Sequence, residues 1–361
     1  MTQMSETPPF GTHLWANVLL CVLATIVGIA LIEFGYRIVA GQPVLALKNW
    51  RLERIEQRTL GARSVYDPVL GWKLRPGYTS DGYNTIAHGI RRNLDEHAVR
   101  TGGVLAVGDS FTDGWDDVVD ADTWPAQLER MTGAPVLNGG VGGYATDQII
   151  MRAEMLLPLA RPKTLIVGFL EEDIFRSGHS SFGASKPYFT LSQSELTYHP
   201  PAPMAAPDQR TASSSLRDAL GYSAVLHAVF SRLAPHFWYG RSGEEVFVQV
   251  DNDPVGVTCA LLRRLKAKTD AEGVIALLFL QHGWHMIVER TEPSDNAKRV
   301  SDCARAAGFK VIDQFSPLRD MAVTDLAGFT SLYAREGNGY GHLNAKGNRH
   351  AAELLVRALT P

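Results

Sequence analysis

From Gly103 onward, short apolar runs alternate with longer segments of helical pattern. The apolar runs are GVLAVG, APVLN, KTLIVGFL, VIALLFL and KVIDQ, and segments such as DTWPAQLERM and DQIIMRAEMLL lie between them. Continuous apolar runs are typical of strands buried on both faces, and parallel strands need crossover helices between them. The alternation therefore predicts an α/β fold in which helices cover both faces of a parallel sheet.

An uncharged stretch precedes this alternation. Residues 14–32, LWANVLLCVLATIVGIALI, contain no Asp, Glu, Lys or Arg. At about 1.5 Å per helical residue, the stretch nearly spans a hydrocarbon core of about 30 Å. A secretory signal peptide would begin with basic residues, and residues 1–13 contain neither Lys nor Arg. We expect an N-terminal tail over 1–13 and one transmembrane anchor over 14–36.

The remaining chain divides into two further parts and an insertion. Residues 37–100 combine a charged juxtamembrane helix with a segment rich in Gly and Pro that suggests short strands and turns. Residues 101–361 form the expected main domain. Within it, residues 176–250 are too long for an ordinary loop. This insertion is either a lid, a partner surface or a surface excursion without function.

Composition excludes several classes of function. The formal net charge is −3 and no basic tract stands out, so we expect no nucleic-acid partner. The spacing of the three cysteines, Cys21, Cys259 and Cys303, suits neither a zinc site nor a disulfide framework. His282 and His285 lack a nearby third ligand, so loop packing is the expected role of both. We expect no metal.

Three features follow strands or precede the last helix, where sites gather in an open α/β sheet. They are Gly108-Asp109-Ser110, the glycine-rich segment 138–148 and His342, which precedes a helix capped by Asn344. A nucleophilic serine needs a base and donors for an oxyanion, and these features could supply both. Each also has a structural interpretation: a helix cap, a tight turn and a structural histidine. The glycine-rich segment also fits G-x-G-x-x-A, the pattern of dinucleotide-binding sites. That pattern is expected on the first βα turn, whereas here it lies on the second.

Taken together, these blocks resemble a known superfamily. GDSFTDGW, VLNGGVGGYATDQ, LIVGFLEEDI and GHLNAKGN occur in the order and spacing of the SGNH/GDSL hydrolases, and the segment before them is similar to membrane-anchored bacterial members. The resemblance implies a three-layer α/β/α sandwich and hydrolysis or transfer of O-acyl groups without a cofactor. It implies that Ser110 is the nucleophile and His342 the base, and that the N–H groups of Ser110 and Gly143 hold the oxyanion. Asp109, Asn138, Glu172 and Asp173 are expected to line the site.

The chain departs from the family pattern in two places. Glu172 stands where the family has an asparagine that donates to the oxyanion, and Asp173 follows it. An ionised carboxylate cannot donate, whereas a protonated one could if its pKa were raised well above about 4.3. The family also has an acid three residues before the histidine, where this chain has Gly339. Asp325 and Glu336 are nearby in the sequence, and Glu336 is the preferred orienting acid.

These observations predict a serine esterase or O-acyltransferase that acts on an acylated carbohydrate of the cell envelope. The alternative is a catalytically degenerate relative that binds glycans or serves an assembly complex. Envelope substrates imply a single-pass protein of the bacterial inner membrane with its catalytic domain in the periplasm. The flanking charges favour the opposite orientation, because the basic residues follow the span: Arg37, Lys48, Arg51 and Arg54.

Overall fold

The computed structural model describes residues 11–202, 212–239, 247–337 and 339–359, and the chain forms two compact units. One unit comprises Met1–Arg58 with Ala205–Gly243, and the other Thr59–Met204 with Glu244–Pro361. This division differs from the expected one. The strand-rich segment belongs to the larger unit, and the middle of the insertion belongs to the smaller unit. Residues 1–10 of the expected tail lie outside the described residues.

The larger unit is built on a five-stranded parallel sheet with the order β14-β13-β7-β5-β6. The prediction of a parallel sheet is confirmed. The strands coincide with the five apolar runs of the sequence: β5 (Val104–Val107), β6 (Val136–Asn138), β7 (Thr164–Phe169), β13 (Ile275–Leu280) and β14 (Lys310–Asp313).

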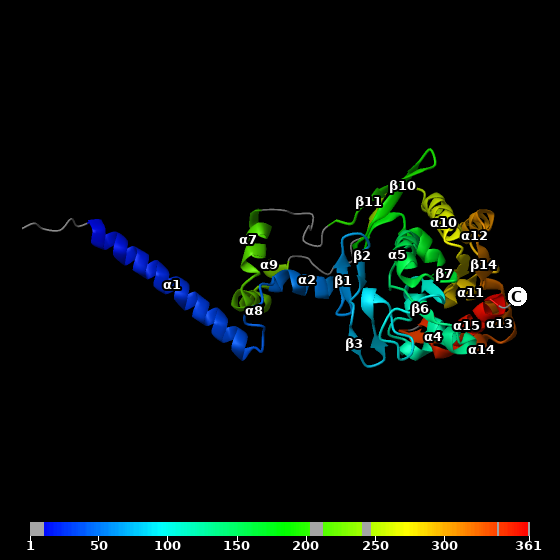
Figure 1. Ribbon diagram of the computed structural model, residues 1–361, viewed down its shortest axis with the longest axis horizontal. Coiled ribbons are helices and arrows are strands. Elements are labelled where there is room, and N and C mark those ends of the chain that lie inside the picture. The colour runs from blue at the N-terminus through cyan, green and yellow to red at the C-terminus, as the bar shows by residue number, and fades with distance from the viewer. Residues whose placement is uncertain (1–10, 203–211, 240–246, 338, 360–361) are drawn as a thin grey trace, which may run out of the picture. The chain divides into compact units, whose positions relative to one another are not determined.

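Helices cover both faces of this sheet, which makes three layers (Figure 1). Successive side chains of a strand point to opposite faces, so Leu105 and Val107 enter one core while Val104 and Ala106 enter the other. The first core is closed by α5 (Thr146–Ala160), α10 (Pro254–Ala271) and α12 (Asp295–Ala307). The second is closed by α4 (Trp124–Thr132), α13 (Phe315–Thr324) and α15 (Ala345–Leu359). The predicted three-layer α/β/α sandwich is confirmed.

Shorter elements surround the sheet. Two hairpins and a 3-10 turn precede it: β1 (Ser64–Asp67) with β2 (Gly71–Leu74), β3 (Thr79–Ser80) with β4 (Tyr83–Asn84), and η1 (Ala87–Gly89). The insertion adds β8 (His179–Phe182), β9 (Ala184–Ser185), β10 (Tyr188–Ser192), β11 (Glu195–His199) and β12 (Phe247–Gln249). The remaining elements are α3 (Ser110–Asp113), η2 (Asp120–Asp122), α6 (Glu171–Arg176), α11 (Trp284–Glu289), α14 (Leu326–Thr330), β15 (Tyr333–Glu336) and β16 (Gly339–Leu343).

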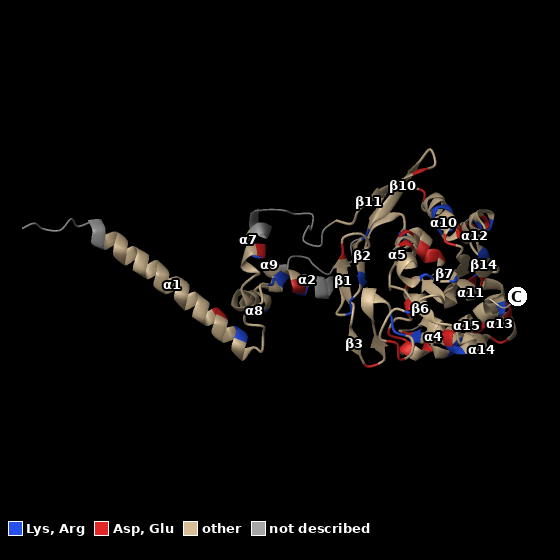
Figure 2. Ribbon diagram, viewed as in Figure 1, with Lys and Arg blue, Asp and Glu red and all other residues tan. Residues whose placement is uncertain are grey.

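The smaller unit contains the apolar N-terminal helix. This helix, α1 (Gly11–Val39), is long and apolar enough over Leu14–Val39 to be a candidate membrane span. No part of its most apolar window is buried by other residues, and beyond its grey start Figure 2 shows no Lys, Arg, Asp or Glu colour along the helix until its C-terminal end. The unit also contains α7 (Ala212–Leu220), α8 (Ala224–Leu233), α9 (Pro235–Tyr239) and most of α2 (Trp50–Leu60).

The two cysteines of the larger unit are bonded to each other, which corrects the sequence interpretation. Cys259 on α10 and Cys303 on α12 form a disulfide with a Cα–Cα distance of 5.8 Å. Sequence spacing could not predict this pair, because the two helices meet only after both have packed on the same face of the sheet. Cys21 remains a free thiol.

Loss of this disulfide should destabilise the larger unit. The bond closes a loop with a sequence separation of 44 residues, for which chain entropy gives about 4 kcal/mol. We therefore expect Cys259→Ser/Cys303→Ser to lose about 3–4 kcal/mol of unfolding free energy in guanidinium denaturation of the detergent-solubilised protein. Cys21→Ser is the control and should match the wild type. A double variant as stable as the wild type would contradict the cross-link.

Candidate active site

Ser110 and His342 meet at the carboxyl end of the sheet. Ser110 is the first residue of α3, directly after β5, and Asp109 caps this short helix by accepting a hydrogen bond from the Phe111 N–H. Gly108 permits the tight turn, because a Cβ there would lie 2.0 Å from Thr112 Oγ1. His342 comes from β16, 232 residues further along the chain, and its Nε2 lies 2.9 Å from Ser110 Oγ. The predicted nucleophile and base are therefore within hydrogen-bond distance.

The other ring nitrogen of His342 faces an acid that the sequence interpretation missed. His342 Nδ1 lies 3.1 Å from Asp117 Oδ2. The expected acid, Glu336, instead packs its carboxylate against the backbone of Gly341. Asp117 stands only seven residues after Ser110, in the block GDSFTDGWDD, so the acidic pair at its end was the available signal. The structure thus gives a Ser110–His342–Asp117 chain of contacts.

Two aromatic side chains fix the imidazole plane. Trp115 stacks on His342 with ring centroids 5.9 Å apart and an interplanar angle of 18°. Phe111 contacts it at 5.3 Å. Trp115 itself has a φ of +47°, which is uncommon for a residue other than glycine and must be held by its surroundings.

Arg91, which is completely buried, clamps the loop of residues 113–120 through hydrogen bonds from its guanidinium group. Arg91 Nε donates to Asp120 Oδ1 at 3.0 Å. The two terminal nitrogens donate to four backbone carbonyls, those of Asp113, Trp115, Val118 and Gly82. Residues 113–120, which carry Trp115 and Asp117, therefore wrap around one guanidinium group from the segment HGIRRN.

The glycine-rich second loop lies beside α3. A Cβ on Gly140 would lie 2.4 Å from the Asp113 nitrogen, so the two backbones touch. Gly143 has a φ of +78°, a conformation that favours glycine, and lines a cavity of about 610 Å³ with Trp115. Its role as an oxyanion donor stays a prediction. Asn138 is buried and bonds the Thr112 carbonyl and the Gly140 N–H, so it braces the loop rather than lining a cavity.

Glu172 lines the same cavity as the Ser–His pair. This cavity has a volume of about 290 Å³, and its lining includes Ser110, His342, Glu172, Trp284 and Tyr340. Glu172 Oε2 is buried and has no hydrogen-bond partner among the residues that the structure describes. Burial raises the pKa of Glu172, and this effect exceeds the lowering by its own backbone N–H and by Arg176; Glu171 and Asp109 add smaller raising contributions. The carboxyl group is thus biased toward its neutral form.

Asp109 and Asp173 are absent from the cavity lining, and both lie near the guanidinium group of Arg176. Asp173 accepts hydrogen bonds from the Leu170 N–H and from Arg176 Nη1, which lies 3.8 Å from Asp109 Oδ2. Burial raises the pKa of Asp173, and the nearby Asp109 adds to this effect. Asp173 therefore stabilises the first turn of α6 by accepting the Leu170 N–H, and it does not line the cavity. Asp109 Oδ2 lies 3.2 Å from Ser110 Oγ, so it contacts the nucleophile directly.

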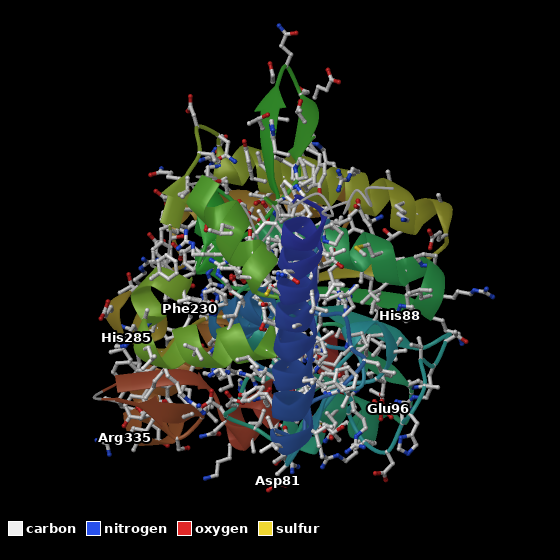
Figure 3. The ribbon with its side chains drawn as sticks, turned by 90° about the vertical axis from the view of Figure 1, so that its left-hand side faces the viewer. Asp81, His88, Glu96, Phe230, His285 and Arg335 are labelled. Carbon is white, nitrogen blue, oxygen red and sulfur yellow. A yellow bond between two sulfur atoms is a disulfide. The ribbon has the colours of Figure 1, made fainter. Side chains whose placement is uncertain are left out.

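The two histidines of QHGWH have different surroundings. His282 Nε2 lies 2.7 Å from Asp313 Oδ1, and the ring packs on Phe315. His285, labelled in Figure 3, is exposed and contributes to the lining of the 290 Å³ cavity. Among the described residues, no group of three or more His, Cys, Asp or Glu side chains could hold a metal ion.

Comparison with known proteins gives structural similarities only. No family model and no curated protein matches the chain. Among solved structures, a lipolytic protein of the G-D-S-L family from Desulfitobacterium hafniense is similar with 15% identity and a TM-score of 0.39, over 73% of this chain and 100% of the other. The acetyl xylan esterase AlAXEase has 10% identity and a TM-score of 0.40, over 71% and 99%. A lipase/acylhydrolase from Enterococcus faecalis has 13% identity and a TM-score of 0.37, over 71% and 95%.

Similarities at this level describe neighbours in shape, and no substrate follows from them. The solved structures to which the chain is similar are consistently GDSL-type lipolytic hydrolases and esterases.

Proposed function

We propose that the protein is a serine esterase or O-acyltransferase. The observation that carries this proposal is the continuous contact from Ser110 Oγ to His342 Nε2 at 2.9 Å and from His342 Nδ1 to Asp117 Oδ2 at 3.1 Å. This arrangement gives a weak hydroxyl nucleophile its base, and gives the base a group that fixes its tautomer. A degenerate relative would have no reason to retain both contacts.

The mechanism has two acyl transfers. Ser110 Oγ attacks the ester carbonyl while its proton passes to His342 Nε2, and Asp117 stabilises the imidazolium that forms. The tetrahedral oxyanion collapses to an acyl-serine, and the departing alkoxide takes the proton from His342. A second hydroxyl compound then attacks the acyl-serine and gives its proton to the same nitrogen. The second tetrahedral intermediate collapses, the acyl–Oγ bond breaks, and Ser110 Oγ takes that proton back from His342. If that compound is water the products are the free acid and Ser110, and if it is a sugar hydroxyl the product is a new ester.

Within this mechanism, Glu172 acts as a neutral donor to the oxyanion. A protonated carboxyl group has one O–H to donate, and the buried Glu172 Oε2 faces no competing partner among the described residues. The N–H groups of Ser110 and Gly143 are the other proposed donors. Loss of one such donor typically costs about 10²–10³ in kcat.

The pH dependence of the rate tests this role. Glu172 has a raised pKa, so its proton is present at low pH and is lost as the pH rises through that value. We expect the kcat of the wild type to fall along this alkaline limb, and Glu172→Gln, which donates at every pH, to keep its rate there. Glu171→Gln is the matched control and should retain the alkaline fall. An identical alkaline limb in the wild type and Glu172→Gln would contradict the proposal.

The substrate class that we propose is an acylated carbohydrate of the cell envelope. Trp284 and Tyr340 pack together in the catalytic cavity with ring centroids 5.1 Å apart. Glu289 and Arg290 also line the cavity and offer an acceptor and a donor to hydroxyl groups. An apolar surface beside a few polar groups is what recognition of a sugar ring requires.

We further propose that the larger unit lies on the periplasmic side of the inner membrane. The Cys259–Cys303 disulfide supports this side, because disulfides persist in oxidising compartments. The basic residues after α1 favour the opposite side, but such charges act statistically. Alkaline phosphatase fused to the C-terminus should therefore be active in cells. If alkaline phosphatase is inactive there and only a reporter that requires the cytoplasm is active, the larger unit lies on the cytoplasmic side.

Hydrolysis of an aryl acetate by the purified full chain tests the activity itself. We expect measurable turnover by the wild type, and losses of several orders of magnitude in Ser110→Ala and in His342→Ala. If the wild type has no activity above that of Ser110→Ala on any acyl ester, the glycan-binding alternative gains the advantage.

A further inference from the structure

An exposed apolar row runs along the helices of the smaller unit. Tyr222 is 49% exposed, Val229 43%, Leu233 81% and Phe237 48%. Val229 and Leu233 are four residues apart on α8, which places both side chains on one face of that helix, and Phe237 follows on α9 after the non-helical Ala234. Contiguous exposed apolar side chains often mark a surface that contacts a protein or a membrane, so this row is a candidate for such a contact.

The opposite face of these helices is already packed. Phe230, labelled in Figure 3, stacks on Trp238 with ring centroids 5.1 Å apart. Trp238 is fully buried, and Ala224 is 3% exposed. Val229 and Leu233 therefore form the outer face of an amphipathic helix whose inner face is packed within its own unit. Phe237 borders this face, because its ring also contacts Phe230 at 5.7 Å.

A charged side chain at the end of the apolar helix ties this element to α1. Glu33 accepts hydrogen bonds from Ser223 Oγ at 2.8 Å, from the Ala224 N–H at 2.8 Å and from the Val225 N–H at 3.2 Å. It also pairs with Arg37 at 2.7 Å. The first turn of α8 is thus held at the first charged residue after the uncharged stretch 14–32.

That position is the expected level of the membrane surface. A helix that crosses the hydrocarbon core places its first flanking charges and aromatic residues among the lipid headgroups. Phe34, 47% exposed, is next to Glu33, and Arg232 lies exposed beside Leu233 on α8. Apolar side chains bordered by a basic residue are typical of helices that lie in this interface.

We propose that α8 and α9 lie on the surface of the bilayer that α1 spans, with Val229, Leu233 and Phe237 inserted at the headgroup boundary. The occupant of the exposed row is then lipid. This inference rests on α1 as the membrane span and does not depend on the chemistry of Ser110. It gives the insertion a function that is neither a lid nor a surface excursion, because it orients the end of the anchor at the interface.

Depth-dependent quenching in the full chain tests the inference. In a Cys21→Ser background, with Cys259 and Cys303 oxidised, a cysteine introduced at Leu233 is the only free thiol and takes an environment-sensitive fluorophore. Phe237→Cys gives a second reporter in case one label perturbs the helix. Val323→Cys, 68% exposed on the larger unit, is the water-exposed control, and Leu23→Cys on α1 is the control for deep insertion. The proteins are reconstituted in vesicles of phosphatidylcholine and phosphatidylglycerol.

We expect lipids carrying a shallow spin label to quench the fluorophores at 233 and 237 severalfold more than the one at 323. Iodide in the aqueous phase should quench them severalfold less. Equal quenching by iodide at 233, 237 and 323 would overturn the proposal. Protection from both quenchers would also overturn it, because a protein surface and not lipid would then cover the row. If the label at 23 is not quenched by a deep spin label, α1 does not span the bilayer and the premise fails instead.

Discussion

Asp117→Asn should lower kcat for ester hydrolysis by about 10⁴, the loss typical of a serine triad whose orienting carboxylate becomes an amide. The reason is the 3.1 Å contact between Asp117 Oδ2 and His342 Nδ1. An ionised carboxylate accepts the Nδ1 proton and leaves Nε2 free to receive the proton of Ser110. An amide can donate to Nδ1 instead, which places the ring proton on Nε2 and removes the base.

Two neighbouring acids provide the controls for this prediction. Glu336→Gln and Asp116→Asn change the charge near His342 without changing the group that Nδ1 contacts, so both should retain most of the wild-type kcat. The KM of Asp117→Asn should change little, because the carboxylate contacts the histidine and not the substrate. A large loss in Glu336→Gln with none in Asp117→Asn would return the orienting role to Glu336.

Arg91→Met should remove about 3–5 kcal/mol from the unfolding free energy of the larger unit, which is the usual cost of leaving one partner of a buried ion pair alone. Arg91 is completely buried, and its five hydrogen bonds hold Asp120 and four carbonyls of the surrounding loops. Methionine fills a similar volume but can donate to none of these five acceptors, of which, among the residues that the structure describes, only Asp120 and the Gly82 carbonyl have another donor nearby.

Arg92→Met is the matched control for this substitution. Arg92 is its neighbour in sequence, but its side chain is 28% exposed and its nitrogen lies 3.8 Å from Asp120, so its loss should cost about 1 kcal/mol or less. Guanidinium denaturation measures both variants. Arg91→Met should also lose activity at temperatures where it stays folded, because Asp117 and Trp115 are on the loop that Arg91 clamps. Equal stability of the two variants would contradict the clamp.

The sheet could be predicted because its signal is local. Each of its strands is a continuous apolar run between helical segments. Short runs of this kind, such as VIALLFL, are typical of strands that are buried on both faces of a sheet. The capping residue Asn344 could be identified for the same reason, since a cap acts within three residues of itself. Ser110 and His342 were predicted from short blocks whose order resembles a known superfamily.

The features that escaped prediction all depend on distant contacts. Asp117 reaches His342 only because Arg91 folds the intervening loop, and the hairpin of β15 and β16 carries the histidine into place. Cys259 and Cys303 meet only when α10 and α12 have packed on the same sheet face. Likewise, the insertion divides between the two units because Glu33 binds the start of α8, which is 190 residues away.

Covalent labelling of the full chain with a fluorophosphonate tests the central claim most directly. The probe reacts only with a serine whose base is in place, and it needs no knowledge of the natural ester. We predict one adduct on the wild type, located by peptide mass spectrometry on Ser110, and none on Ser110→Ala or His342→Ala. A wild type that stays unlabelled, or equal labelling of Ser110→Ala, would contradict the assignment of Ser110 as a nucleophile.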